Sequence, residues 1–334
     1  MSVFEESKSY RPFKYPKLVE MAKVHSVDMH WTDAQVDLTD DLRQYNSKDG
    51  LATKDVDHET NKHIIDSILC LFTELDKVVA GGYTKLLPHF ENNEVRNWFL
   101  TAGSREVIHQ RAYALAAETF GFEESDWIAF SDYAAMQGKI DVMTVDTIDK
   151  NDKFYKLEVA TELAKLLLGE GIGLFAAFAT LLNFKRYGIL IGTNDINQWS
   201  LLDENEHVNG NIIVLNNIRK ELTAEENKEL NNVIKMLIAA YVDAEHRFID
   251  LVFEMGSPQG LTKQELKEYI NYLGELRAYQ LDIEGEWTVR DNPLPWIEFM
   301  LSGKNHDNFF EKRVTDYSHG GLSGVIEYSK YSVD

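Results

Sequence analysis

The fold is decided by the stretch Ser104-Arg105-Glu106-Val107-Ile108-His109-Gln110-Arg111-Ala112-Tyr113. Glu106 and His109 are three residues apart, and Tyr113 follows His109 by four. In a helix, side chains at positions i, i+3, i+4 and i+7 lie on one face. The spacing therefore predicts that a carboxylate, an imidazole and a phenol point into the same volume.

A second Glu-x-x-His pair follows at Glu204 and His207. One such pair alone indicates little, because an exposed salt-bridging helix face has the same pattern. Two pairs on facing helices, with one more carboxylate from each of two other helices, form the inner wall of a dimetal helical bundle. Asp76 and Glu170 can supply these carboxylates, since each lies in an apolar helical pattern where an unpaired charge is costly to bury. The sequence predicts an all-α, ferritin-like helical bundle with a dinuclear metal site in its core.

Apolar spacing and capping signals predict a mostly helical chain. Glu170 is expected to open its helix, Gly81 and Gly138 to end two others, and helical periodicity to be lost from Asn292. Only Val142–Val145 could pair as a strand. We expect an N-terminal arm packed on the bundle (1–56), a dimetal helical domain (57–317) and a flexible tail (318–334). The expected helices are 57–80, 92–120, 125–136, 153–168, 170–187, 194–214, 223–253 and 262–280.

Composition narrows the function classes. The chain has 334 residues and a formal net charge of −21, which argues against a nucleic-acid-binding surface. Its one cysteine, Cys70, lies in an apolar run and excludes an intramolecular disulfide. The longest apolar run, 171–182, is too short to span a bilayer, and the N-terminus lacks the regions of a signal peptide. We expect a soluble, cytoplasmic protein with no membrane partner.

The expected ligands are carboxylate oxygens and imidazole nitrogens, which suit Fe or Mn and leave open positions for O2. Four carboxylates also offset the charge of two divalent ions, as a buried site requires. Leu174 and Phe178 follow Glu170 by four and eight residues and are expected to line the pocket around Tyr113.

With these residues placed, the sequence resembles the small subunit (R2, beta) of class I ribonucleotide reductase over essentially its whole length. The resemblance includes the dipeptide Asp203-Glu204, the run Asn292-Pro293-Leu294-Pro295-Trp296, and the run Phe309-Phe310-Glu311-Lys312-Arg313-Val314-Thr315-Asp316-Tyr317-Ser318. It implies two Fe ions per chain, with Mn/Mn or Mn/Fe also accepted. The implied ligands are Asp76, Glu106, His109, Glu170, Glu204 and His207.

The resemblance also implies a role for residues outside the ligand set. Tyr113 would store a tyrosyl radical formed with O2, and Trp31 and Asp203 would pass it on, together with His109. A tail tyrosine, either Tyr328 or Tyr331, would continue the route to a large (alpha, R1) subunit that reduces ribonucleotides to deoxyribonucleotides for DNA replication. The tail would dock on that subunit, and the small subunit would be a homodimer.

One departure from the family pattern is Ser200, where the family tends to place an apolar residue against the radical. Three other functions fit parts of the pattern. An R2-like ligand-binding oxidase shares the metal ligands, an iron-storage ferritin shares the bundle, and a non-enzymatic helical protein could carry the carboxylates as solvated groups. The presence of Tyr113, Trp31, Asp203 and the tail tyrosines favours the reductase subunit.

Overall fold

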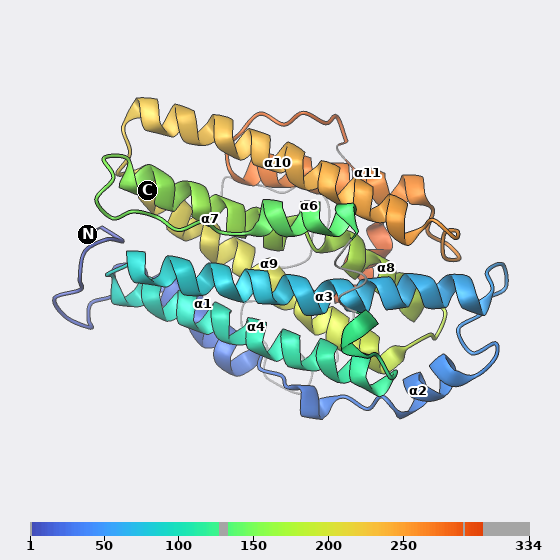
Figure 1. Cartoon of the computed structure of the whole chain (residues 1–334). Helices are drawn as coiled ribbons and strands as arrows, with labels where there is room; N and C mark the ends of the chain where they lie inside the picture. Colours follow the sequence, from blue (N-terminus) through green and yellow to red (C-terminus); the bar gives the residue numbers. More distant parts are fainter. Residues whose placement is uncertain (1, 127–132, 290, 303–334) are drawn as a thin grey trace.

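The computed structural model describes residues 2–126, 133–289 and 291–302, and it contains no strand in these ranges. Long helices lie roughly along a common direction, with α3 and α4 side by side and α10 packed against α6, α7 and α11 (Figure 1). The helices are α1 (Pro16–Lys23), α2 (Thr39–Asn46), α3 (His58–Leu86), α4 (Asn93–Thr119), α6 (Ala134–Met143), α7 (Tyr155–Gly171), α8 (Phe175–Lys185), α9 (Ile191–Arg219), α10 (Ala224–Val252) and α11 (Lys263–Gln280). The predicted all-α bundle is confirmed, and the possible strand at Val142–Val145 is wrong because α6 continues to Met143.

The four helices that matter most for the site are α3, α4, α7 and α9. Two of them begin at side-chain caps: Asp57 accepts a hydrogen bond from the backbone N–H of Thr60, and Asn92 from those of Glu94 and Val95. Such caps satisfy backbone donors that have no partner within the helix. α3 packs on α4, and α7 packs on α9, so all four enclose one interior.

Glycines do not end the helices where the sequence predicts. α3 runs through Gly81 and Gly82 to Leu86, and α6 runs through Gly138. A Cβ atom on Gly82 would lie 2.9 Å from a methyl carbon of Leu166 on α7. Gly82 therefore allows α3 to approach α7 closely, and this packing outweighs the weak helix propensity of glycine.

The α7–α8 region differs from the prediction in a way that affects the site. Glu170 lies in the last turn of α7 and does not open α8, because the chain leaves the helical conformation at Ile172. Arg277 on α11 donates to the carbonyl of Gly171 (3.1 Å), and Glu245 on α10 accepts from the N–H of Ala176 (2.9 Å). The break is thus held from both sides by buried charged groups.

Glu245 also forms an ion pair with Lys139 of α6, and both side chains are fully buried. The two oxygens of Glu245 are therefore both occupied, one by the Lys139 ammonium and one by the Ala176 amide. Burial lowers the pKa of Lys139 and raises that of Glu245. This pair ties α6 and α10 to the start of α8.

The N-terminal arm lies against the bundle through α1, which packs on α4 and α9. A π-helical turn, Val24–Asp28, continues directly from α1, and the Met29 N–H closes it on the carbonyl of Val24 (3.0 Å). Trp31 follows and is buried, with 5% of its surface exposed. The arm therefore brings its own side chains to the bundle interior.

At the other end of the chain, residues 295–302 are helical, so the expected loss of helix after Asn292 is wrong for this segment. The segment Tyr155–Lys185 is apolar and long enough to cross a membrane by composition. Its most apolar window is completely buried between the other helices, which identifies it as a core segment of the bundle.

Candidate metal centre

Four helices bring six predicted ligand side chains into the core. Each Glu-x-x-His pair occupies one face of its helix, as the spacing predicts. All six side chains are buried, with exposed fractions of 0–2%. They are Asp76 on α3, Glu106 and His109 on α4, Glu170 on α7, and Glu204 and His207 on α9.

Glu106 and Glu204 lie between the two histidines. The Nδ1 atom of His207 is 3.1 Å from one oxygen of Glu106 and 3.4 Å from one of Glu204. The Nδ1 atom of His109 is 3.6 Å and 3.3 Å from the other oxygens of the same two carboxylates. Glu106, Glu204 and the two histidines would thus be able to hold two neighbouring metal ions between them.

The remaining two carboxylates are placed at different ends of this group. An oxygen of Glu170 is 3.3 Å from Nδ1 of His207, and ligand atoms of Glu106, Glu170, Glu204 and His207 all lie within 4.8 Å of one another. Asp76 lies outside this set of four. The charges of His109, Glu106 and Glu204 all act on its carboxyl group, which places it on the His109 side.

The side chains fit a pair of divalent cations. Oxygen atoms of all four carboxylates, and Nδ1 of both histidines, are buried without a hydrogen-bond partner in the described part of the chain. Leaving so many polar atoms unpartnered is costly, and ions that accept their lone pairs remove the cost. The donor set of carboxylate oxygen and imidazole nitrogen is one that Fe and Mn accept.

The pKa values of the site residues show that bound protons offset the charge of the carboxylates before metal binds. Burial raises the pKa of Glu170 to about 8 and that of Asp76 well above its usual value. Burial alone would raise the pKa of Glu106 too, but the imidazoles of His109 and His207 lower it to about 2. Facing carboxylates outweigh burial and raise the pKa of both histidines. Metal binding must therefore displace protons.

Asp203 supports the His109 side of the site. One of its oxygens accepts from Nε2 of His109 (3.0 Å) and from the indole N–H of Trp31 (2.9 Å). Arg105 donates to the same oxygen through Nε and one terminal nitrogen (3.0 and 2.8 Å). Burial opposes ionisation of Asp203, but these partners hold its pKa well below the usual range. Arg105 was missed in the sequence, although it lies within the quoted stretch.

Asn211 supports the Glu170 side and was also missed. Its amide donates to Glu170 (3.0 Å) and to the hydroxyl of Tyr83 (3.0 Å), while its oxygen accepts from Trp98 (3.0 Å). Asn211 follows His207 by four residues, so helical spacing alone would have placed it on the ligand face.

His25 is the third residue that sequence reasoning missed. Its Nε2 is 2.9 Å from Nε2 of His207, and its Nδ1 is 3.6 Å from the second oxygen of Asp203. The side chain is completely buried. Burial lowers the pKa of His25 to about 3, so its imidazole is neutral. No spacing signal in the sequence points to it.

Tyr113 is fully buried and stacks on Phe72, with ring centroids 4.3 Å apart. Phe178 also packs against Phe72 (5.0 Å), and Leu174, which precedes α8, is buried. Burial raises the pKa of Tyr113 well above its usual value, and the Ser200 hydroxyl opposes this rise. Neither hydroxyl has a hydrogen-bond partner at normal distance within the described residues.

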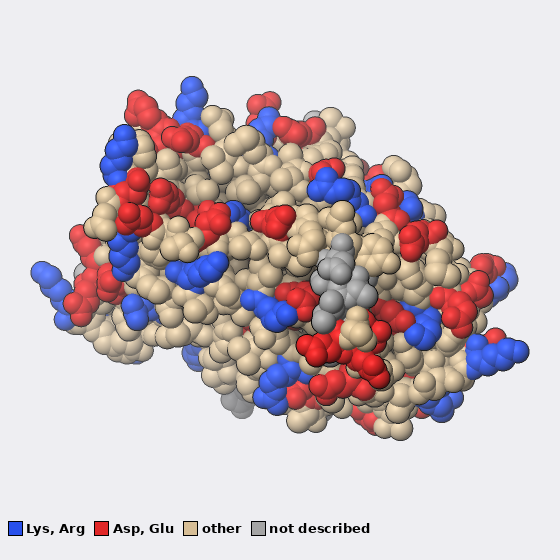
Figure 2. All heavy atoms as spheres, in the orientation of Figure 1, with Lys and Arg blue, Asp and Glu red and all other residues tan. Residues whose placement is uncertain are grey.

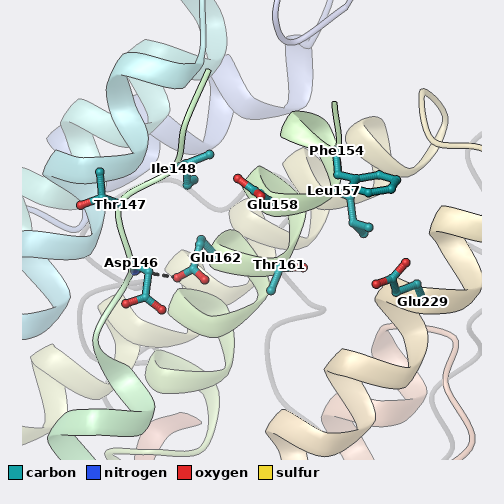
Figure 3. A pocket seen from close by; sticks show the side chains of 9 residues that line it. All are labelled: Asp146, Thr147, Ile148, Phe154, Leu157, Glu158, Thr161, Glu162 and Glu229. Atoms are coloured by element: carbon teal, nitrogen blue, oxygen red, sulfur yellow. Dashed lines mark hydrogen bonds between the residues drawn. The ribbon is translucent and has the colours of Figure 1, made fainter. Parts of the chain in front are cut away.

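The tail tyrosines Tyr328 and Tyr331, and the run 309–318, lie outside the described residues. A surface pocket of about 370 Å³ lies elsewhere, at the α7 face near Asp146, Glu158 and Glu229 (Figure 3). None of its lining residues belongs to the metal centre. On the face seen in Figure 2, Lys and Arg side chains are interspersed with more abundant acidic ones and form no continuous basic surface.

Comparisons of the sequence and of the fold with known proteins point to one family. The family model of the ribonucleotide reductase small chain matches residues 7–293. A probable ribonucleoside-diphosphate reductase small subunit of Invertebrate iridescent virus 3 is 29% identical over 95% of this chain and 85% of its own length.

Solved structures with low sequence identity share the fold. A putative class I ribonucleotide reductase from Bacillus halodurans superposes with a TM-score of 0.73 at 17% identity, covering 85% of this chain and 99% of its own. Dimanganese(II)-NrdF of Streptococcus sanguinis has a TM-score of 0.71 at 14% identity and covers 88% and 98%. The chain therefore belongs to the family of ribonucleotide reductase small chains.

Proposed function

We propose that this chain is the radical-generating subunit of a ribonucleoside-diphosphate reductase, with two metal ions held by Asp76, both Glu-x-x-His pairs and Glu170. The observation that carries the proposal is the arrangement around His109. This residue faces the shared carboxylates through Nδ1, bonds Asp203 through Nε2, and lies one helical turn before the buried Tyr113.

The bound metals would supply the electrons that reduce O2 and the oxidising equivalent that Tyr113 receives. The protein's contribution is to protect the product of that oxidation. Tyr113 is completely buried and stacked on Phe72, so water and external reductants are kept from the phenoxyl oxygen. Phe178 packs on the same Phe72 ring and Leu174 is buried, so both are proposed to belong to the apolar surroundings of Tyr113.

Trp31, Asp203 and His109 form the proposed route by which the radical leaves the centre. Hydrogen bonds of 2.9 and 3.0 Å join the indole to the imidazole through one oxygen of Asp203, and the two rings are stacked at 5.7 Å. Beyond Trp31 the radical would reach Tyr328 or Tyr331 and then the large subunit, on which the tail docks.

The proposal includes a homodimer in the cytoplasm. Leu100 and Val107 are exposed by 54% and 51% and lie two turns apart on α4, where a second copy of the chain would cover them. The metal is proposed to be Fe, with Mn/Mn or Mn/Fe held by the same ligands. One structural relative, the Streptococcus sanguinis protein, is a dimanganese(II) form.

The test is EPR spectroscopy after anaerobic Fe(II) loading and exposure to O2. Wild type is expected to show a tyrosyl doublet, which Tyr113→Phe abolishes while binding the same amount of iron. Tyr241→Phe is the matched control, because Tyr241 is equally buried but bonds the backbone carbonyls of Val142 and Lys165. It should keep the doublet.

Bound iron with no doublet in wild type would contradict radical storage with iron. Manganese loading would then decide between a manganese-dependent reductase subunit and the ligand-binding oxidase. For radical transfer, Trp31→Phe should keep the doublet and lose ribonucleotide reduction with the large subunit. Reduction at the wild-type rate would exclude Trp31 from the route.

A further inference from the structure

His25 connects the two halves of the metal centre. It belongs to the π-helical turn Val24–Asp28 of the arm, 182 residues from His207 in sequence. The two imidazoles contact each other edge to face, with centroids 4.8 Å apart and planes at 80°. π-helical turns are rare and occur often at functional sites.

The hydrogen bond between the two rings has a defined direction. Nδ1 of His207 faces Glu106, Glu170 and Glu204, so this nitrogen would present its lone pair to a metal ion held by these residues. A neutral imidazole then carries its proton on Nε2, which donates to Nε2 of His25. His25 must accept with that nitrogen and carry its own proton on Nδ1.

The proton on Nδ1 of His25 points toward the free oxygen of Asp203, at 3.6 Å. This distance is longer than a normal hydrogen bond but favourable as an electrostatic contact. The other oxygen of Asp203 accepts from His109. One carboxylate thus fixes the tautomer of one histidine directly and that of the other through His25.

We infer that His25 is a positioning residue that holds His207 with Nδ1 directed at its metal ion. The inference rests on the proposed dimetal centre and adds to it a residue that contacts no metal. Partners of this kind typically contribute about 10- to 100-fold to metal affinity. Since His25 bonds only His207 among the ligands, its loss should weaken one ion more than the other.

The experiment is Mn(II) titration of the metal-free protein, with free Mn(II) measured by EPR. Wild type is expected to bind two ions. His25→Ala should keep one tight site and weaken the second by about 10- to 100-fold. His25→Gln should restore it to within a few-fold, because the amide oxygen of glutamine can accept the Nε2 proton of His207.

A matched control separates positioning from packing. Met21 lies one turn before His25 on the arm and is buried in the core, so Met21→Ala loosens the arm by removing apolar contacts. It should bind two ions as wild type does, and circular dichroism should show that every variant is folded.

Two tight sites in His25→Ala, or equal weakening in Met21→Ala, would overturn the inference and leave the dimetal centre standing. Wild type that binds no metal would instead remove both the inference and the proposed function. The two failures are therefore distinguishable.

Discussion

The Lys139–Glu245 pair and the metal centre are both groups of buried charges in one bundle, but they are balanced differently. In the pair, one ammonium faces one carboxylate, and the second oxygen of Glu245 accepts from Ala176. In the centre, four carboxylates face two imidazoles, and oxygens of all four have no hydrogen-bond partner among the described residues. The difference shows that the first group is complete without an ion, while the second is built to receive cations.

The largest expected effect is on metal binding. Glu204→Gln removes the charge of a carboxylate that contacts both histidines. Mn(II) affinity should fall by more than about 100-fold, because removal of a residue that only bonds a ligand costs about 10- to 100-fold. The metal-free protein should lose stability as well, because Glu204 faces both ligand imidazoles, whose raised pKa values mean that they carry protons before metal binds. Mn(II) titration measures the affinity, and urea unfolding measures the stability of the metal-free protein. The control Glu245→Gln should bind two ions; weakening there would mean that the two groups are not independent.

The second effect is on stability. Glu245→Leu leaves the Lys139 ammonium buried without its partner, which should cost about 3–5 kcal/mol of unfolding free energy. The double variant Lys139→Met/Glu245→Leu should regain most of the loss, because no unpaired charge remains. Urea unfolding of the metal-free proteins checks this, and metal stoichiometry should stay at the wild-type value. If the double variant lost as much unfolding free energy as the two single changes together, the two side chains would not act by neutralising each other's charge.

The third effect is the pH dependence of stability. Glu170 has a folded pKa of about 8 against 4.5 when unperturbed, and both ligand histidines are also raised. At these three side chains the folded metal-free protein binds more protons than the unfolded chain does, so their contribution to stability is present at low pH and lost as pH rises toward 8. Metal binding needs the deprotonated ligands, so stabilisation by Mn(II) should increase over the same range. Thermal unfolding at pH 6 and 8, with EDTA or with Mn(II), measures the stability of the metal-free protein and the stabilisation by Mn(II). If both quantities changed with pH in the same direction, the exchange of protons for metal would be contradicted.

The smallest effect concerns a neutral polar group beside Tyr113, the hydroxyl of Ser200. Ser200→Ala should keep metal binding and change stability by no more than about 1 kcal/mol, because no charge is left unpaired. The largest g value of the Tyr113 radical should increase, since a nearby hydroxyl that donates a hydrogen bond lowers it. High-field EPR measures the shift. An unchanged g value would mean that the Ser200 hydroxyl does not point at the phenoxyl oxygen.

Helical spacing predicted the bundle and the side chains that meet in it. Glu106 with His109, and Glu204 with His207, are local pairs whose common face follows from the helix repeat. Glu170 illustrates the limit of this reasoning: the sequence placed it at the start of α8, but Arg277 and Glu245 fix the break after it. Local patterns carry no information about those distant partners.

The supporting residues were harder to predict for the same reason. Arg105 and His25 act on Asp203 and His207 across 98 and 182 residues of sequence, and neither contact follows from spacing. Gly82 shows the converse, since its helix-breaking tendency is overridden by the close approach of Leu166. The roles of the site residues remain predictions that the experiments above address.

The arm also has a consequence for how the chain matures. His25 and Trp31 are synthesised early, but their partners His207 and Asp203 follow 182 and 172 residues later. Contacts so distant in sequence form late in folding, because a long loop must close first. During translation the arm must therefore wait until α9 has left the ribosome. A metal ion captured before that moment would meet histidines whose orientation nothing yet fixes, so productive loading belongs to the finished chain.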